Sequence, residues 1–238
     1  MLDWDYATLL SRSFFMLVLL AEEMDNLTAT TLWASIAAAI VLAGIIVALS
    51  LIGKKLTTRT LAMAGVTLAL SYVLSLIRFA PVTFGGEITL AGLLPIIIFA
   101  YFYGFLPGLL TGIIFGLLEF MVAPYVLTPF TFLLDYVFAY SAIAIVPLFS
   151  KAIKNKTAAL AIGITVSYAA SFAFHVVSGI IYFDMGAIWA ELPASTAIGY
   201  SLLYNVIYLV PDCLIVLLAA IPLSASGVID KLKKIAVK

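Results

Sequence analysis

The chain has 238 residues, of which 65% are hydrophobic and 10% are charged, and its mean hydropathy is +1.24. Soluble domains are about half apolar and about one quarter charged, so this composition is typical of a membrane protein. The basic and acidic residues balance, which leaves no net charge that would favour a nucleic-acid partner.

Hydropathy predicts seven membrane-spanning helices. A bilayer core takes about 20 apolar residues of helix, and backbone groups left unpaired in lipid are too costly for irregular spans. Apolar runs of about this length, without the alternation of a strand, occupy residues 29–52, 60–80, 90–106, 107–123, 130–149, 157–183 and 196–223. We therefore expect an all-α integral membrane protein.

The N-terminal segments are expected to be additions to the functional unit. The apolar run in 1–27 is interrupted by Ser11-Arg12-Ser13 and flanked by acidic residues, which makes a poor signal peptide and favours a short interfacial helix. Span 29–52 has no ionisable side chain and is interpreted as an anchor. The predicted domains are an N-terminal extension over 1–57, a six-helix substrate-binding domain over 58–225 and a basic cytoplasmic tail over 226–238.

Basic residues predict the orientation of the bundle. They lie before the second span, between the fifth and sixth spans and in the tail, and are Lys54, Lys55, Arg59, Lys151, Lys154, Lys156, Lys231, Lys233, Lys234 and Lys238. With seven spans these clusters share one side, which the positive-inside rule assigns to the cytoplasm. We expect a multi-pass plasma-membrane protein with a cytoplasmic C-terminus and an extracellular N-terminus.

Polar residues inside the spans mark the candidate site, because an ionisable side chain at the centre of a spanning helix costs about 2.5–3.5 kcal/mol. Asp135, His175, Tyr200 and Asn205 fall at similar depth in the outer halves of three spans. An ion pair with Arg78 is an alternative role for Asp135. A hydrogen-bonded core position is the alternative for His175.

Other polar residues extend this set. Glu119 and Tyr125 lie at the outer end of the fourth span and in the loop after it, where they can line the outer opening of the same candidate site. Asp212 follows Pro211 in the last span, where a structural or proton-linked role is favoured. The single cysteine, Cys213, and the single histidine do not provide a transition-metal ligand set, so neither a metal nor a cofactor is expected.

Several segments together resemble the YuaJ/ThiT family of thiamine-specific substrate-binding (S) components of energy-coupling-factor transporters. These are GGEITL at 85–90, LLDYVFAY at 133–140, FAFHVVSG at 172–179 and YSLLYN at 200–205. The resemblance covers about residues 58–225. It implies a six-helix S-component that captures thiamine from outside and docks on a transmembrane coupling subunit driven by two cytoplasmic ATPases.

The resemblance also implies which residues bind the vitamin. Those that match the family's pocket are Tyr125, Asp135, Tyr136, His175, Phe183, Tyr200 and Asn205. Phe183 stands where the family usually has tryptophan. The small-residue helix face used for docking in the family corresponds to Gly65 and Ala69, whose spacing of four residues allows close helix packing.

The chemistry of these residues suits thiamine, which has a cationic thiazolium and a flat aminopyrimidine. A carboxylate such as Asp135 can neutralise the cation or accept from the amine, and aromatic faces add cation–π attraction. His175 and Asn205 supply fixed donors and acceptors in a mostly apolar pocket.

Three alternatives remain open. A proton-coupled secondary transporter acting through Asp212 or Glu119 would show an inverted repeat, and no convincing repeat is visible in the sequence. An intramembrane enzyme would need a nucleophile–base pair or a metal cluster. An S-component for another vitamin differs only in its ligand. The chain lacks the Gly-x-x-x-x-Gly-Lys-Ser/Thr phosphate loop, so an ATP-driven importer requires partner ATPases.

Overall fold

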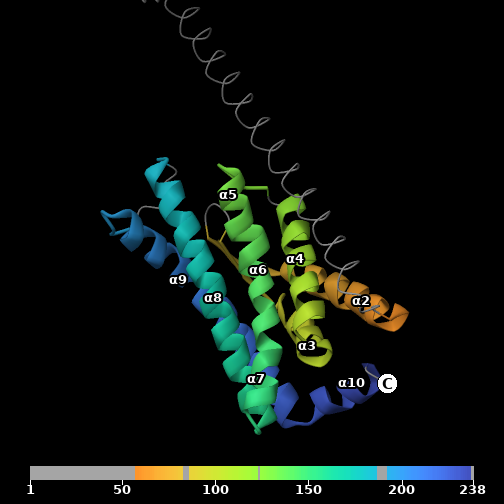
Figure 1. The fold of residues 1–238 in the computed structure, drawn as a ribbon. Coiled ribbons are helices and arrows are strands. Elements are labelled where there is room, and N and C mark those ends of the chain that lie inside the picture. Colours follow the sequence, from red (N-terminus) through yellow and green to blue (C-terminus); the bar gives the residue numbers. More distant parts are fainter. Residues whose placement is uncertain (1–56, 83–85, 123, 187–191, 237–238) are drawn as a thin grey trace, which may run out of the picture.

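The computed structural model describes residues 57–82, 86–122, 124–186 and 192–236, and most of these are helical. Four helical runs are long and apolar enough to cross a membrane, namely α4 (Phe105–Val122), the run Pro129–Ala152, α8 (Lys156–Asp184) and α9 (Ala197–Ala225). They lie side by side in one bundle (Figure 1). The predicted multi-pass helical membrane fold is thereby supported. The helices predicted within 1–27 and 29–52 lie outside the described residues.

The run Pro129–Ala152 is not one regular helix. It consists of α5 (Pro129–Phe132), a π-helical turn η1 (Leu133–Phe138), α6 (Ala139–Ser141), a 3₁₀ turn η2 (Ala142–Ile145) and α7 (Val146–Ala152). Such changes of helix type inside a spanning segment often mark functional positions. Here the π-helical turn carries Asp135 and Tyr136.

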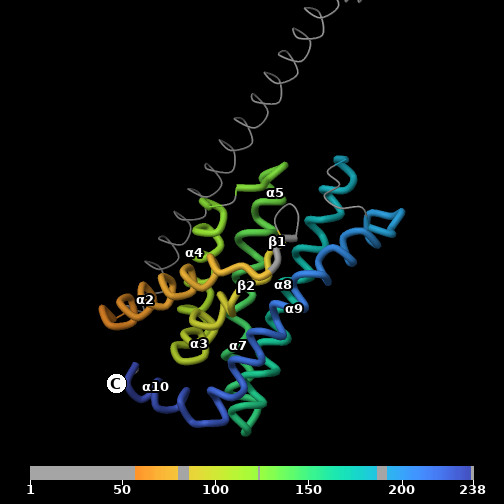
Figure 2. The backbone as a smooth tube through the Cα atoms, turned by 180° about the vertical axis from the view of Figure 1, so that it is seen from behind, coloured from red at the N-terminus to blue at the C-terminus, as the bar shows by residue number. Residues whose placement is uncertain are grey.

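The predicted span over 60–80 is wrong at its C-terminal end. Helix α2 (Thr58–Ser75) stops at Ser75, and strand β1 (Arg78–Val82) pairs antiparallel with β2 (Gly86–Thr89). A proline disfavours helical conformation in the residue before it, so Ala80, which precedes Pro81, is compatible with the strand and not with the end of the predicted helix. Helix α2 crosses the bundle at a steep angle to α4 and α8, and the hairpin lies between α2 and α9 (Figure 2).

Helix α3 (Leu94–Tyr103) is shorter than the predicted span over 90–106. Its ten residues reach about 15 Å, half of a bilayer core. Ile96, Ile97 and Ala100 are fully buried, so α3 forms part of the core of the bundle. Gly104, with φ of 95°, separates α3 from α4.

Helix α4 packs closely on its neighbours through three glycines spaced by four residues, two of them against the run Pro129–Ala152 and one against α3. A Cβ atom on Gly112 or Gly116 would collide with the carbonyl oxygen of Tyr140 or Tyr136, respectively. A Cβ on Gly108 would lie 2.6 Å from the side chain of Ala100. Small residues at such spacing let helix backbones approach in membranes. This contact fixes the depth and rotation of the π-helical turn.

The basic tail forms helix α10 (Val228–Ala236), which folds back under the bundle (Figures 1 and 2). It lies at the same end as the turn between α7 and α8 (Figure 1). An ion pair joins Lys156 in α8 to Asp230 in α10, with Nζ 2.7 Å from Oδ2. We call this the basic end of the bundle, because Lys151, Lys154 and the lysines of α10 lie there.

Candidate functional site

The π-helical turn places two neighbouring residues in one cavity. The N–H of Ala139 bonds to the carbonyl of Leu134, five residues back instead of the four of an α-helix, so this turn is wider than a regular one. Asp135 and Tyr136 both line a cavity of about 90 Å³. Tyr140, four residues further, lines it as well.

The carboxylate of Asp135 is held by helix α8. Its Oδ1 lies 2.9 Å from His175 Nδ1, and its Oδ2 accepts a 2.6 Å hydrogen bond from Ser178 Oγ. The side chains of Asp135 and His175 are 16% and 17% exposed. When Nδ1 carries the imidazole proton, it donates to the carboxylate, and Nε2 can accept from a ligand. The carboxylate is therefore fixed in place by two donors.

Helix α9 adds an amide to the same cavity. Asn205 Nδ2 donates to the carbonyl of Ser201 at 2.9 Å, and Asn205 Oδ1 accepts from Tyr208 OH at 2.6 Å. Gly179 allows the close approach of α8 to α9, because a Cβ there would collide with Ser201 Oγ and lie 3.5 Å from Asn205 Nδ2. Asp135, His175 and Asn205 therefore share one cavity, as their depth in the sequence predicts.

The loop before α5 closes one side of the cavity. The N–H of Tyr125 donates to Tyr136 OH at 3.2 Å, and its carbonyl accepts from Tyr182 OH at 3.0 Å. The rings of Tyr125 and Tyr182 lie 5.4 Å apart. These contacts connect the predicted loop tyrosine to the acidic-tyrosine pair.

A second cavity of about 380 Å³ adjoins the first beside the β-hairpin. The two cavities share Tyr125, Tyr136, Tyr140, His175 and Tyr208. The larger one is also lined by Glu119, as the sequence predicts, and by residues from the hairpin and from α9. Together they form one polar and aromatic chamber between the hairpin, the π-helical turn, α8 and α9.

Acidic groups of the larger cavity have internal partners. Glu119 Oε1 accepts from Ser75 Oγ at 2.8 Å, which connects α4 to the end of α2. Arg78 pairs with Glu87 across the hairpin at 2.5 Å, so the alternative pairing of Arg78 with Asp135 does not form. Partial burial raises the pKa of the Glu87 carboxyl, and the charge of Arg78 opposes this rise.

Asp212 attaches the hairpin to the bundle. Its Oδ1 accepts from both N–H and Oγ1 of Thr89, at 2.8 and 2.9 Å, and its Oδ2 accepts from Tyr168 OH at 2.6 Å. The N–H of Gly86 donates to Tyr204 OH at 3.1 Å at the other end of β2. These contacts favour the structural role expected for Asp212.

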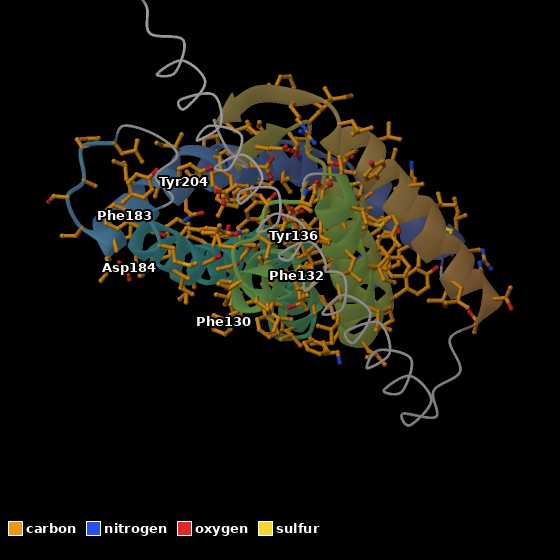
Figure 3. The ribbon with its side chains drawn as sticks, turned by 90° about the horizontal axis from the view of Figure 1, so that it is seen from above. Phe130, Phe132, Tyr136, Phe183, Asp184 and Tyr204 are labelled. Carbon is orange, nitrogen blue, oxygen red and sulfur yellow. The ribbon has the colours of Figure 1, made fainter. Side chains whose placement is uncertain are left out.

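Two predicted site residues lie behind the lining of both cavities. Tyr200 is buried, stacks on Tyr204 at 6.3 Å and contacts the ring of Phe183 at 5.3 Å. Of these three, Tyr204 lines the smaller cavity. Viewed from above, Tyr204 lies between Phe183 and Tyr136 (Figure 3). Phe183 and Tyr200 thus support the wall, and a direct contact of either with a ligand stays a prediction.

The predicted site left out several lining residues, although their spacing contained a signal. Tyr204 and Tyr208 follow Tyr200 at intervals of four residues, which puts all three on one face of α9. Ser178 follows His175 by three residues on one face of α8. Adding the residues that lie three or four positions from each predicted site residue would have identified them.

The predicted docking residues lie on α2 and line neither cavity. Gly65 and Ala69 are exposed, and no atom lies within 4 Å of a Cβ built on Gly65. Leu61, Val66 and Leu70 on the same helix are also half or more exposed. Within the part of the chain that the structure describes, this face of α2 is therefore open.

Comparison with known proteins identifies the family. Residues 61–229 match the family described as Thiamine transporter protein (Thia_YuaJ). The thiamine transporter ThiT of Bacillus subtilis (strain 168) is 32% identical over 146 residues, which cover 55% of this chain and 71% of that protein. The solved structure of ThiT from Listeria monocytogenes has a TM-score of 0.58 at 22% identity and covers 74% of this chain and 96% of that one, which shows a shared fold. The chain belongs to the Thia_YuaJ family of thiamine transporter proteins.

Proposed function

We propose that this chain binds thiamine in the chamber between the π-helical turn, α8 and α9, as the substrate-binding component of a vitamin importer. The observation that carries the proposal is the cavity shared by Asp135, His175 and Asn205. A fixed carboxylate, an imidazole acceptor and an amide among aromatic rings match a cationic ligand with a flat heteroaromatic ring. Membership of a family of thiamine transporters supports the same ligand.

The charge of the chamber adds to this argument. Glu87, Glu119 and Asp212 line the larger cavity, and Asp135 lines the smaller one. Among the described residues, neither lysine nor arginine lines either cavity; His175 lines both, and Arg78 forms an ion pair with Glu87. Such a lining favours a ligand with a positive charge, and the thiazolium of thiamine is permanently cationic.

Energy for uptake would come from partners. The sequence has no phosphate-binding loop, and we propose that a transmembrane coupling subunit and two cytoplasmic ATPases drive transport. The exposed small residues Gly65 and Ala69 on α2 support a close helix–helix contact with that subunit. In this arrangement the basic end faces the cytoplasm, as the positive-inside rule predicts.

Two measurements test the proposal. Titration calorimetry of the purified full chain against thiamine, riboflavin and biotin is expected to give saturable heat with thiamine alone. Uptake of labelled thiamine by cells that produce the chain with or without the coupling subunit and ATPases is expected only with all partners present. Absence of thiamine binding would remove the ligand assignment. Uptake without the ATPases would instead favour a secondary transporter.

A further inference from the structure

Helix α10 has one face that is fixed to the bundle. Ile229 and Ala236 are buried, Asp230 pairs with Lys156, and Lys233 Nζ lies 5.3 Å from the centre of the Tyr101 ring. Asp230, Lys233 and Ala236 follow one another at intervals of three residues, and Ile229 lies four residues before Lys233. The four residues therefore share one side of the helix. At about 100° per residue, the packed side therefore spans roughly 120°, about one third of the helix circumference.

The end of α10 is also tied to the bundle by side chains from two other helices. Arg59 at the start of α2 donates to the carbonyl of Ile235, and Tyr103 OH at the end of α3 donates to the carbonyl of Ala236 at 2.6 Å. Carbonyls at a helix C-terminus lack intrahelical partners, so these donors satisfy them. Helix α10 is thus held at both ends, across the basic end of the bundle.

The other side of α10 combines an apolar stripe with lysines. Leu232 and Ile235 are 45% and 67% exposed, and Val228 lies on the same stripe. With about 3.6 residues per turn, Lys231 falls beside this stripe and opposite the packed side, and Lys234 lies beyond Lys231, one turn after Asp230. Both lysines are exposed. Around the helix, the order is therefore packed side, apolar stripe, then lysines.

This order is the one that a helix needs at the surface of a bilayer. An interfacial helix buries its apolar stripe at the boundary of headgroups and acyl chains, and its basic residues reach the headgroups. Lysines can extend their apolar stems along such a boundary while the ammonium stays polar. Lys151 and Lys154 add exposed positive charge at the same end of the bundle.

We infer that α10 is an interfacial helix that binds anionic phospholipid headgroups through Lys231 and Lys234, with Leu232 and Ile235 inserted beside the bundle. The occupant of this face is the leaflet at the basic end of the bundle. We choose an anionic lipid because the exposed lysines are positively charged. Each basic residue near an anionic surface contributes about 1 kcal/mol to membrane binding, or about fivefold in affinity. This function is separate from ligand binding in the chamber.

The lipid preference can be measured by native mass spectrometry of the full chain in micelles that contain phosphatidylcholine and phosphatidylglycerol. The wild-type chain is expected to retain phosphatidylglycerol preferentially. The double variant Lys231→Gln/Lys234→Gln is expected to lower that preference about twenty-fivefold. Lys151→Gln/Lys154→Gln makes the same change of charge at the same end and is expected to have a much smaller effect. Equal losses in the two variants, or no loss in the first, would overturn the assignment to α10.

The depth of the helix gives an independent test. The full chain with Ile235→Cys in a Cys213→Ala background is labelled with an environment-sensitive fluorophore and placed in phosphatidylglycerol-containing vesicles. The fluorophore is expected to shift to the blue and to be quenched by lipids that carry a spin label on the upper acyl chain. Emission as in water, without quenching, would show that this face is not in the bilayer and would overturn the inference.

Discussion

Asp135 and His175 belong to different helices, 40 residues apart in sequence, and their side chains meet at 2.9 Å. The same carboxylate accepts from Ser178, so two donors of α8 hold one acceptor of the π-helical turn. A carboxylate fixed by such donors does not need to reorganise when a cation binds. The pair therefore joins the two walls of the chamber and fixes the charge that we propose for ligand recognition.

Replacing Asp135 with asparagine is expected to weaken thiamine binding by about tenfold or more. The variant removes a charge but keeps the shape, and hydrogen bonds to charged groups contribute about 1.5–3 kcal/mol. Titration calorimetry measures the change in Kd. Asp184→Asn, at the exposed end of α8, removes the same charge and is expected to bind thiamine as the wild type does. Unchanged affinity in the Asp135 variant would exclude this carboxylate from the site.

Replacing Gly116 with alanine is expected to destabilise the protein by about 1–3 kcal/mol, because the added methyl collides with the carbonyl of Tyr136. Thermal unfolding in detergent should show a Tm lower by several degrees. Gly65→Ala is the matched control, since a Cβ there has no atom within 4 Å. If both variants unfold at the same temperature, α4 does not pack on the π-helical turn as described.

Replacing Asp212 with alanine is expected to loosen the β-hairpin. The change leaves the N–H of Thr89 without its carboxylate acceptor and removes the attachment of β2 to α9. Hydrogen–deuterium exchange at residues 86–90 should become faster. Tyr168→Phe removes one donor to Asp212 and keeps both bonds to Thr89, so the exchange of the hairpin should stay close to that of the wild type. Slow exchange in the Asp212 variant would mean that other contacts hold the strand.

Replacing Gly65 with tryptophan is expected to leave thiamine binding unchanged and to reduce uptake in the presence of the coupling module. A large side chain on the open face of α2 blocks a close helix–helix contact. Binding is measured by calorimetry, and uptake with labelled thiamine. Ile162→Trp, on an exposed face of α8, adds a ring elsewhere and should reduce neither. Full uptake in the Gly65 variant would remove this face from the proposed dock.

Much of the fold and of the chamber follows from the sequence because hydropathy and depth are properties of single segments. The spans at α8 and α9 are predicted to within two residues at either end. Asp135, His175 and Asn205 are predicted to meet because they lie at similar depth in their spans, and they line one cavity. The depth of each residue along its helix was enough to predict that the three meet, although the rotation of the helices was not known.

The remaining differences arise where local geometry overrides hydropathy. Residues 76–82 are apolar enough to continue a span, but the contacts of β2 with Tyr204 and Asp212 stabilise a hairpin instead. Phe183 and Tyr200 have the predicted depth, but they pack against each other and against Tyr204 and are not among the residues that line either cavity. Hydropathy reports neither the tertiary partner of a strand nor the side chains that pack between a residue and a cavity.

The π-helical turn makes the chamber dependent on chain length at one point. Deletion of a single residue within Leu133–Phe138 would restore regular α-helix there and rotate the segment on one side by about 100° relative to the other. Asp135 would then turn away from His175, while the hydropathy of the span would hardly change. Two chains with equally apolar fifth spans can therefore differ in whether they bind a ligand at all, and the register across this turn is what distinguishes them.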